Sequence, residues 1–117
     1  MPPVASFHYA VIATLPSFSV RDEYVAWLAG ATAGQGHVAD VIAAGATSGE
    51  VILLDGEGPP RVQARYTFAN RDEFDAYVRD HSPRLRAEGL ARFGSWGITF
   101  ERTAGEVVYA RLSTRPS

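Results

Sequence analysis

Histidine side chains are the groups in this sequence best suited to transfer a proton near neutral pH, because an imidazole has an ordinary pKa of about 6.5. The chain has three of them, His8, His37 and His81. His37 stands three residues before Asp40, so a helix would place both on one face, where the carboxylate can orient the imidazole or approach the same ligand. We predict His37, Asp40 and His81 as the catalytic residues.

Each histidine also has an interpretation without catalysis. His37 and Asp40 can form a solvated pair on a helix surface. His81 ends an apolar stripe just before Pro83, and an imidazole at such a bend commonly satisfies free backbone carbonyls. His8 fits an ordinary surface position on a strand.

Other patterns of catalytic or metal-binding residues are missing from the sequence. The absence of cysteine excludes a disulfide framework, a thiolate nucleophile and cysteine-ligated metals. The histidines have no HxxxH or HxH spacing, the serines no GxSxG context, and the glycines no GxGxxG order. We therefore expect no metal and no cofactor.

Composition limits the partners further. The formal net charge is -2 and the pI near 5.9, which gives no general attraction to nucleic acid or to anionic membranes. With 117 residues and 46% hydrophobic content, the chain fits a single domain over residues 1–117, with frayed ends at 1–5 and 113–117. The sequence shows neither an export signal nor a membrane-spanning run, and we expect a cytoplasmic protein.

The clearest element is a helix that begins after Asn70. Asn70 can cap it, and Glu73 stands where a capping-box residue reaches back. Spacings of three and four place Phe74, Tyr77 and Val78 on its buried face.

A second helix follows a bend at Ser82 and Pro83, which make a good cap and first-turn pair. We expect Glu88 to pair with Arg92 one turn later and Gly94 to end the helix. The residues predicted to point inward are Leu85, Leu90 and Phe93.

Helical signals in the first half are interrupted. Ser19 and Asp22 predict a helix start, and glycines at 30, 34 and 36 predict a break before the helix resumes at His37. Gly45 would end that second segment. The inward residues are predicted to be Tyr24, Trp27, Leu28, Ala31, Val38, Val41 and Ile42.

Alternation of apolar and polar residues predicts the strands. A turn is expected at residues 55–60, and another at Ala104 and Gly105. The five expected strands are residues 7–14, 50–54, 61–69, 96–101 and 107–112.

This order predicts an α+β, ferredoxin-like βαββαβ fold, an antiparallel sheet with helices on one face. The apolar face, which should take the helices, carries Phe7, Tyr9, Val11, Val62, Tyr66, Phe68, Ile98 and Phe100. The other face carries His8, Ile12, Gln63, Arg65, Thr99 and Glu101. That second face is either solvated in a monomer or enclosed between two sheets in a dimer.

Two motifs resemble the DUF4286 family, a domain of unknown function among the dimeric α+β barrels. They are YVRDHSPRLRAEGLARFG at residues 77–94 and GHVADVIAAGA at 36–46, similar to the family's EEHAPALRAEGLARFG and EHIPEVLATG. FERT at 100–103 is similar to its last strand. Matching positions include His37, Gly45, His81, Pro83, Leu85, Arg86, Glu88, Gly89, Arg92, Phe93 and Gly94. Ala39 replaces the family's proline, and AGATAGQG looks like an insertion before His37.

The resemblance implies a homodimeric α+β barrel with a pocket between sheet and helices. We expect a cofactor-free cyclase or isomerase that acts on an apolar, aromatic or polyketide-like molecule by histidine and carboxylate acid-base chemistry. Residues predicted to contact the substrate are Tyr9, Trp27, Arg65, Tyr66, Phe68, Arg86 and Phe100. A non-catalytic binding or accessory protein, or a structural dimer with a filled core, is the alternative.

Overall fold

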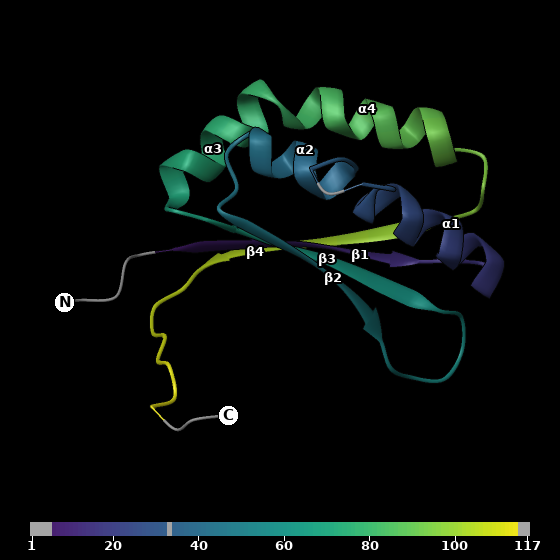
Figure 1. The fold of residues 1–117 in the computed structure, drawn as a ribbon, viewed down its shortest axis with the longest axis horizontal. Coiled ribbons are helices and arrows are strands. Elements are labelled where there is room, and N and C mark those ends of the chain that lie inside the picture. Colours follow the sequence, from purple (N-terminus) through teal and green to yellow (C-terminus); the bar gives the residue numbers. More distant parts are fainter. Residues whose placement is uncertain (1–5, 33, 115–117) are drawn as a thin grey trace.

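One antiparallel sheet carries four helices on a single face. The computed structural model describes residues 6–32 and 34–114. Its strands are β1 (Phe7–Thr14), β2 (Ser48–Leu54), β3 (Arg61–Phe68) and β4 (Thr99–Glu106), in the order β2-β3-β1-β4. Its helices are α1 (Phe18–Ala29), α2 (His37–Ala43), α3 (Arg71–Asp80) and α4 (Ser82–Phe93). All lie above the sheet in Figure 1, which confirms the predicted fold.

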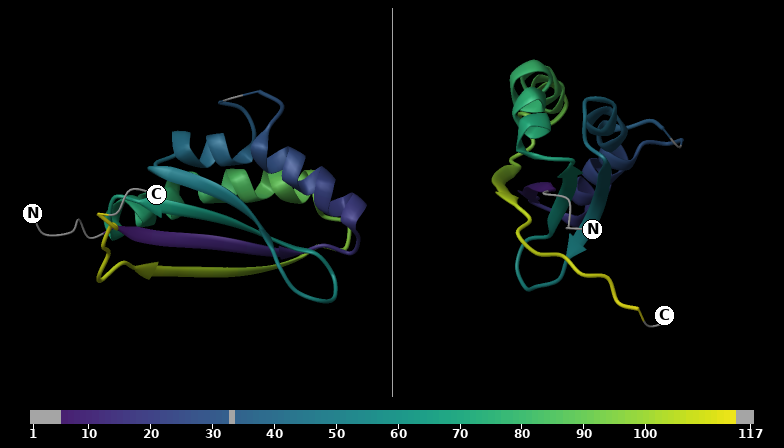
Figure 2. Two further views of the ribbon diagram at one scale, coloured as in Figure 1. Left: turned by 60° about the horizontal axis from the view of Figure 1, so that its bottom comes forward. Right: turned by 90° about the vertical axis from the view of Figure 1, so that its left-hand side faces the viewer.

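The central strand β1 fixes which residues share a face. Tyr9 lies opposite Tyr66 of β3 and Ala104 of β4. Because side chains alternate along a strand, Tyr9 and Tyr66 point toward the helices together, and both are buried. The α1–α2 and α3–α4 pairs stand side by side over this face (Figure 2). No helix in the described ranges is long and apolar enough to cross a membrane.

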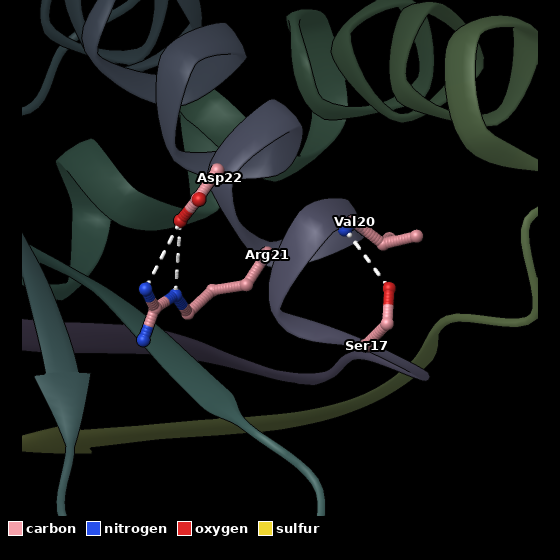
Figure 3. Close-up of polar contacts among 4 residues, drawn as sticks. All are labelled: Ser17, Val20, Arg21 and Asp22. Carbon is pink, nitrogen blue, oxygen red and sulfur yellow. Dashed lines mark hydrogen bonds and ion pairs between the residues drawn. The ribbon is translucent and has the colours of Figure 1, made fainter.

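Helix α1 begins earlier than the sequence predicts. The hydroxyl oxygen of Ser17, not that of Ser19, accepts a hydrogen bond from the amide of Val20 at 3.1 Å (Figure 3). Ser17 has the extended backbone typical of a capping residue. Asp22 takes no part in the cap and instead pairs with Arg21 at 3.0 Å.

The predicted glycine break between α1 and α2 is confirmed. Gly30 and Gly36 have positive φ values of 74° and 96° and approach each other closely. A Cβ atom on Gly36 would lie 2.6 Å from the amide nitrogen of Gly30, so the loop closes tightly. Ala31 lies exposed in this loop, so its predicted burial is wrong. The closed loop brings His37, the first residue of α2, beside α1.

The capped start of α3 and the bend into α4 are both confirmed. The predicted cap at Ser82 is wrong, because Ser82 is the first residue of α4 and the preceding His81 makes no side-chain cap hydrogen bond. The Asn70 side chain accepts a hydrogen bond from the amide of Glu73 at 2.8 Å, and His81 separates the two helices. Leu85 and Phe93 are buried as predicted.

The predicted burial of three apolar helix residues is wrong, and so is one predicted ion pair. Val78 and Leu90 are 41% and 71% exposed, and Ile42 of α2 is 42% exposed, because the helices cover the sheet with a narrower face than the apolar spacing suggests. Arg92 bonds to Glu23 of α1 at 3.2 Å, not to Glu88, which ties α4 to α1.

The last strand is longer than expected. β4 pairs with β1 along its whole length, with Glu106 opposite Phe7, so the turn predicted at Ala104 and Gly105 is wrong. The strand begins at Thr99, and the fifth strand predicted at 107–112 is also wrong. Residues 107–114 carry no helix or strand and run away from the sheet on the side opposite the helices (Figures 1 and 2). Of the predicted frayed ends at 1–5 and 113–117, residues 1–5 and 115–117 lie outside the described residues.

Candidate functional site

A cavity of about 360 Å³ lies between the sheet and the helices. Strands β1, β3 and β4 and all four helices contribute to its lining. Its most distinctive part is a group of tyrosines that converge from strands and helices: Tyr9, Tyr24, Tyr66 and Tyr77. Because each strand directs alternate side chains to this face, Tyr9 and Phe100 reach the cavity from different strands.

Aromatic rings form the side walls of the cavity. Tyr24 packs edge-on against Phe93, with ring centroids 5.6 Å apart, and Trp27 packs edge-on against the same ring at 5.4 Å. Gly89 lets α4 approach Trp27 of α1 closely, since a Cβ atom at position 89 would lie 3.2 Å from Cη2 of Trp27. Such walls suit a flat, apolar ligand.

His37 enters the cavity from the first turn of α2. Its ring stacks on Trp27, with centroids 4.3 Å apart and planes 18° apart. Burial lowers the pKa of His37 to about 4, and the nearby Asp40 carboxylate opposes this shift. The imidazole is therefore neutral at pH 7. Its Nδ1 atom is buried and has no hydrogen-bond partner among the described residues.

Tyr66 supplies a second buried polar atom without a partner. Its hydroxyl oxygen makes no hydrogen bond to any described residue. Burial raises the pKa of Tyr66 strongly, and raises those of Tyr24 and Tyr77 to about 12. These hydroxyls stay protonated at neutral pH, so each can donate a hydrogen bond to a ligand.

The structure brings together only part of the predicted site. Of the residues predicted to bind or act on a substrate, those that line the cavity are Tyr9, Trp27, His37, Tyr66, Arg86 and Phe100. Asp40 lies exposed on α2 outside the lining and reaches His37 only through its charge.

The other predicted residues lie elsewhere. His81 sits at the α3–α4 junction, with its Nδ1 atom 3.3 Å from the Arg84 guanidinium, so it shares no cavity wall with His37. Phe68 is fully buried in the core. Arg65 lies on the opposite face of the sheet and forms an ion pair with Glu50 at 2.7 Å.

Sequence reasoning did not identify Tyr24, Tyr77 and Arg102 as lining residues. Leu90, predicted to point inward, lines the cavity although most of its side chain is exposed. Tyr24 and Tyr77 carry a helical signal of burial, which does not distinguish a core residue from a cavity wall. Arg102 stands two positions after Phe100, and the strand period alone places both on one face. We predicted that the strand would end at residue 101, ahead of a turn at Ala104, and this left Arg102 outside the predicted strand.

The second face of the sheet holds a shallower hollow of about 350 Å³. His8, Gln63 and Arg65 lie along it, in keeping with the predicted polar face. Nowhere in the described part of the chain do three histidine, aspartate or glutamate side chains converge in a way that could hold a metal ion.

Solved structures with the same fold include two dimeric ferredoxin-like proteins from an uncultured marine organism. One superposes with a TM-score of 0.68 at 8% identity, and the other with 0.59 at 16%; each match covers 92% of this chain and 99% of the other. A Bacillus cereus protein, named provisionally as an antibiotic biosynthesis monooxygenase, superposes with 0.60 at 13% identity, over 93% and 99%.

At these identities the likeness is one of fold, and that fold is ferredoxin-like. No protein-family model matches the chain. No curated protein matches it either. The resemblance to DUF4286 is therefore not confirmed.

Proposed function

We propose that this protein binds an apolar, aromatic small molecule in the cavity between sheet and helices and moves a proton on it through His37, as a cofactor-free cyclase or isomerase. The observation that carries the proposal is the pair of buried atoms without partners, His37 Nδ1 and Tyr66 Oη, in an aromatic cavity. A buried polar atom without a partner costs about 1 to 3 kcal/mol, which a ligand with matching polar atoms would offset.

Enolisation of a ketone illustrates the chemistry. Nδ1 of His37 would accept a proton from the carbon next to the carbonyl. The C–H electron pair would form the C=C bond of an enolate, and the π pair of the C=O bond would move to the oxygen. The Tyr66 hydroxyl would donate a hydrogen bond to that oxygen. The imidazolium would then return the proton to the same carbon or, where the enolate is conjugated with a further C=C bond, to the carbon at the far end of that bond, which isomerises the double bond. A histidine with a pKa of about 4 is a weak base, so the enolate charge must stabilise the imidazolium for the step to proceed.

Deuterium exchange tests this step without knowledge of the natural substrate. The protein is incubated with 2-tetralone, an aromatic ketone, in heavy water, and NMR follows deuterium uptake next to the carbonyl. We expect the wild type to accelerate exchange and His37→Gln to reduce the gain by roughly a hundred- to ten-thousand-fold. Tyr66→Phe should also slow it, while His81→Gln serves as the matched histidine control outside the cavity.

A non-catalytic binding protein is the second candidate, and the low pKa of His37 favours it. A neutral imidazole that is hard to protonate is a good hydrogen-bond partner even where it is a poor base. Binding of tetralone without faster exchange would support this function and contradict the enzymatic one. Full exchange activity in His37→Gln would also contradict the role of His37.

We also propose a cytoplasmic homodimer in which the faces with Arg65 meet as an α+β barrel. Three observations support the dimer. The two structurally similar proteins from the marine organism are dimeric. Every residue of β4 is exposed, and so are large apolar side chains that follow β4. These side chains are Val108, Tyr109 and Leu112. Membership of DUF4286 rests on the motifs at 36–46 and 77–94 and belongs to the same proposal.

A further inference from the structure

The charges around the cavity are of one sign. Arg86 reaches it from α4 and Arg102 from β4. The sequence has thirteen aspartates and glutamates, yet no carboxylate in the described part of the chain lines the cavity. The cavity wall is therefore positive, although the formal net charge of the chain is -2.

Neither arginine is neutralised by a carboxylate of the described residues. Five other arginines in the described part of the chain pair with acids, for example Arg65 with Glu50 and Arg92 with Glu23. Across residues 6–32 and 34–114, neither Arg86 nor Arg102 forms an ion pair or a hydrogen bond to a carboxylate. Two arginines without a carboxylate partner that line the same cavity create a site for an anion.

The two guanidinium groups act on the same part of the cavity. Both lie close enough to Tyr77 to oppose the rise of its pKa, and Arg102 has the same effect on Tyr24. Arg102 also lies over the Phe100 ring at 5.6 Å. Both side chains are exposed, whereas the unpartnered atoms of His37 and Tyr66 are buried. The positive charge thus lies on the solvent side of the aromatic walls.

We infer that the cavity takes an aromatic carboxylate, with its ring system between the tyrosines and Trp27 and its carboxylate on Arg86 and Arg102. The planar fork of a guanidinium matches the two oxygens of a carboxylate, which favours this anion. This inference rests on the cavity being the ligand site of the proposed function. It does not rest on proton transfer by His37.

Matched pairs of charged and neutral probes test the inference. The pairs are benzoate and benzamide, 2-naphthoate and 2-naphthamide, and anthracene-9-carboxylate and its amide. Binding is measured by calorimetry and by quenching of tryptophan fluorescence, since Trp27 lines the cavity. At low salt we expect at least one carboxylate to bind about tenfold more tightly than its amide, and the preference to shrink at about 0.5 M NaCl.

Variants then assign the preference to the two arginines. Arg86→Gln and Arg102→Gln should each reduce carboxylate affinity several-fold and amide affinity far less, and the double variant should bind both probes equally. Arg84→Gln is the matched control, because Arg84 lies on α4 outside the cavity lining. Equal binding of carboxylate and amide by the wild type would overturn this inference and leave the proposed function intact. Binding of none of the six probes would overturn both.

Discussion

The pKa of His37 makes the stability of the fold depend on pH in a way that can be measured. Burial lowers this pKa from 6.5 to about 4, so between these values the unfolded chain binds a proton that the folded chain does not. The stabilising contribution is complete above pH 6.5 and is lost as the pH falls toward 4. At pH 4 the free energy of unfolding is lower by about 2 to 3 kcal/mol than it is above pH 6.5, as far as His37 is concerned.

We therefore predict that His37→Gln flattens this part of the stability curve. The free energy of unfolding is measured with urea for both proteins at several pH values between 7 and 4. The carboxylates titrate in both, so the difference between the curves isolates His37. The burial argument fails if the two proteins lose stability in parallel over this range.

At the level of single residues, sequence reasoning located only part of the site. Strand alternation correctly directed Tyr9, Tyr66 and Phe100 toward the helices, because a period of two fixes the face. It could not separate Phe68, which fills the core, from Tyr66, which reaches the cavity. That difference depends on how the helices lie over the sheet. The stack of His37 on Trp27 likewise depends on the closed loop between two helices.

At the level of elements, the tight loop between α1 and α2 positions His37. Gly36 combines a φ of 96° with a contact that leaves no room for a Cβ atom, whereas Gly34 has a φ of 84° and open space. We predict that Gly36→Ala lowers the free energy of unfolding by about 1 to 3 kcal/mol more than Gly34→Ala, since both carry the backbone strain but only Gly36 carries the clash.

Urea unfolding compares the two glycine variants. Tryptophan fluorescence, to which Trp27 and Trp96 both contribute, reports whether the stack of Trp27 with His37 is kept. Equal losses of stability in both variants would show that the close approach of Gly36 to Gly30 does not matter. An unchanged fluorescence spectrum in Gly36→Ala would separate the loop from the position of His37.

The elements themselves were largely predictable. Asn70, the bend at His81 and the glycine break act on neighbouring residues in the sequence. Such local effects do not depend on the rest of the fold, so they can be predicted from the sequence. The end of the chain was misread because Ala104 and Gly105 are typical of turns, yet pairing with β1 along its whole length holds them in β4. Leu90 was misplaced because apolar spacing marks a face without showing how far a neighbouring layer extends over it.

At the scale of the whole molecule, the sheet has one covered face and one open face (Figure 2). The open face carries the Arg65–Glu50 ion pair, with Glu101 farther along the sheet. If two such faces meet, these charges leave bulk water, and the loss of one partner leaves a charge without compensation. We predict that the wild type sediments at micromolar concentration as a dimer of about 25 kDa, twice the chain mass of 12.6 kDa.

Charge reversal on each face tests where the dimer forms. Arg65→Glu places like charges side by side on the open face and should shift the protein to 12.6 kDa. Arg79→Glu makes the same change on the exposed surface of α3, where Arg79 also pairs with a neighbouring acid, Asp80, and it should stay dimeric. A wild type of 12.6 kDa would contradict the dimer itself. A dimeric Arg65→Glu protein would place the interface elsewhere, and exposed β4 with the apolar residues that follow it would be the next surface to test.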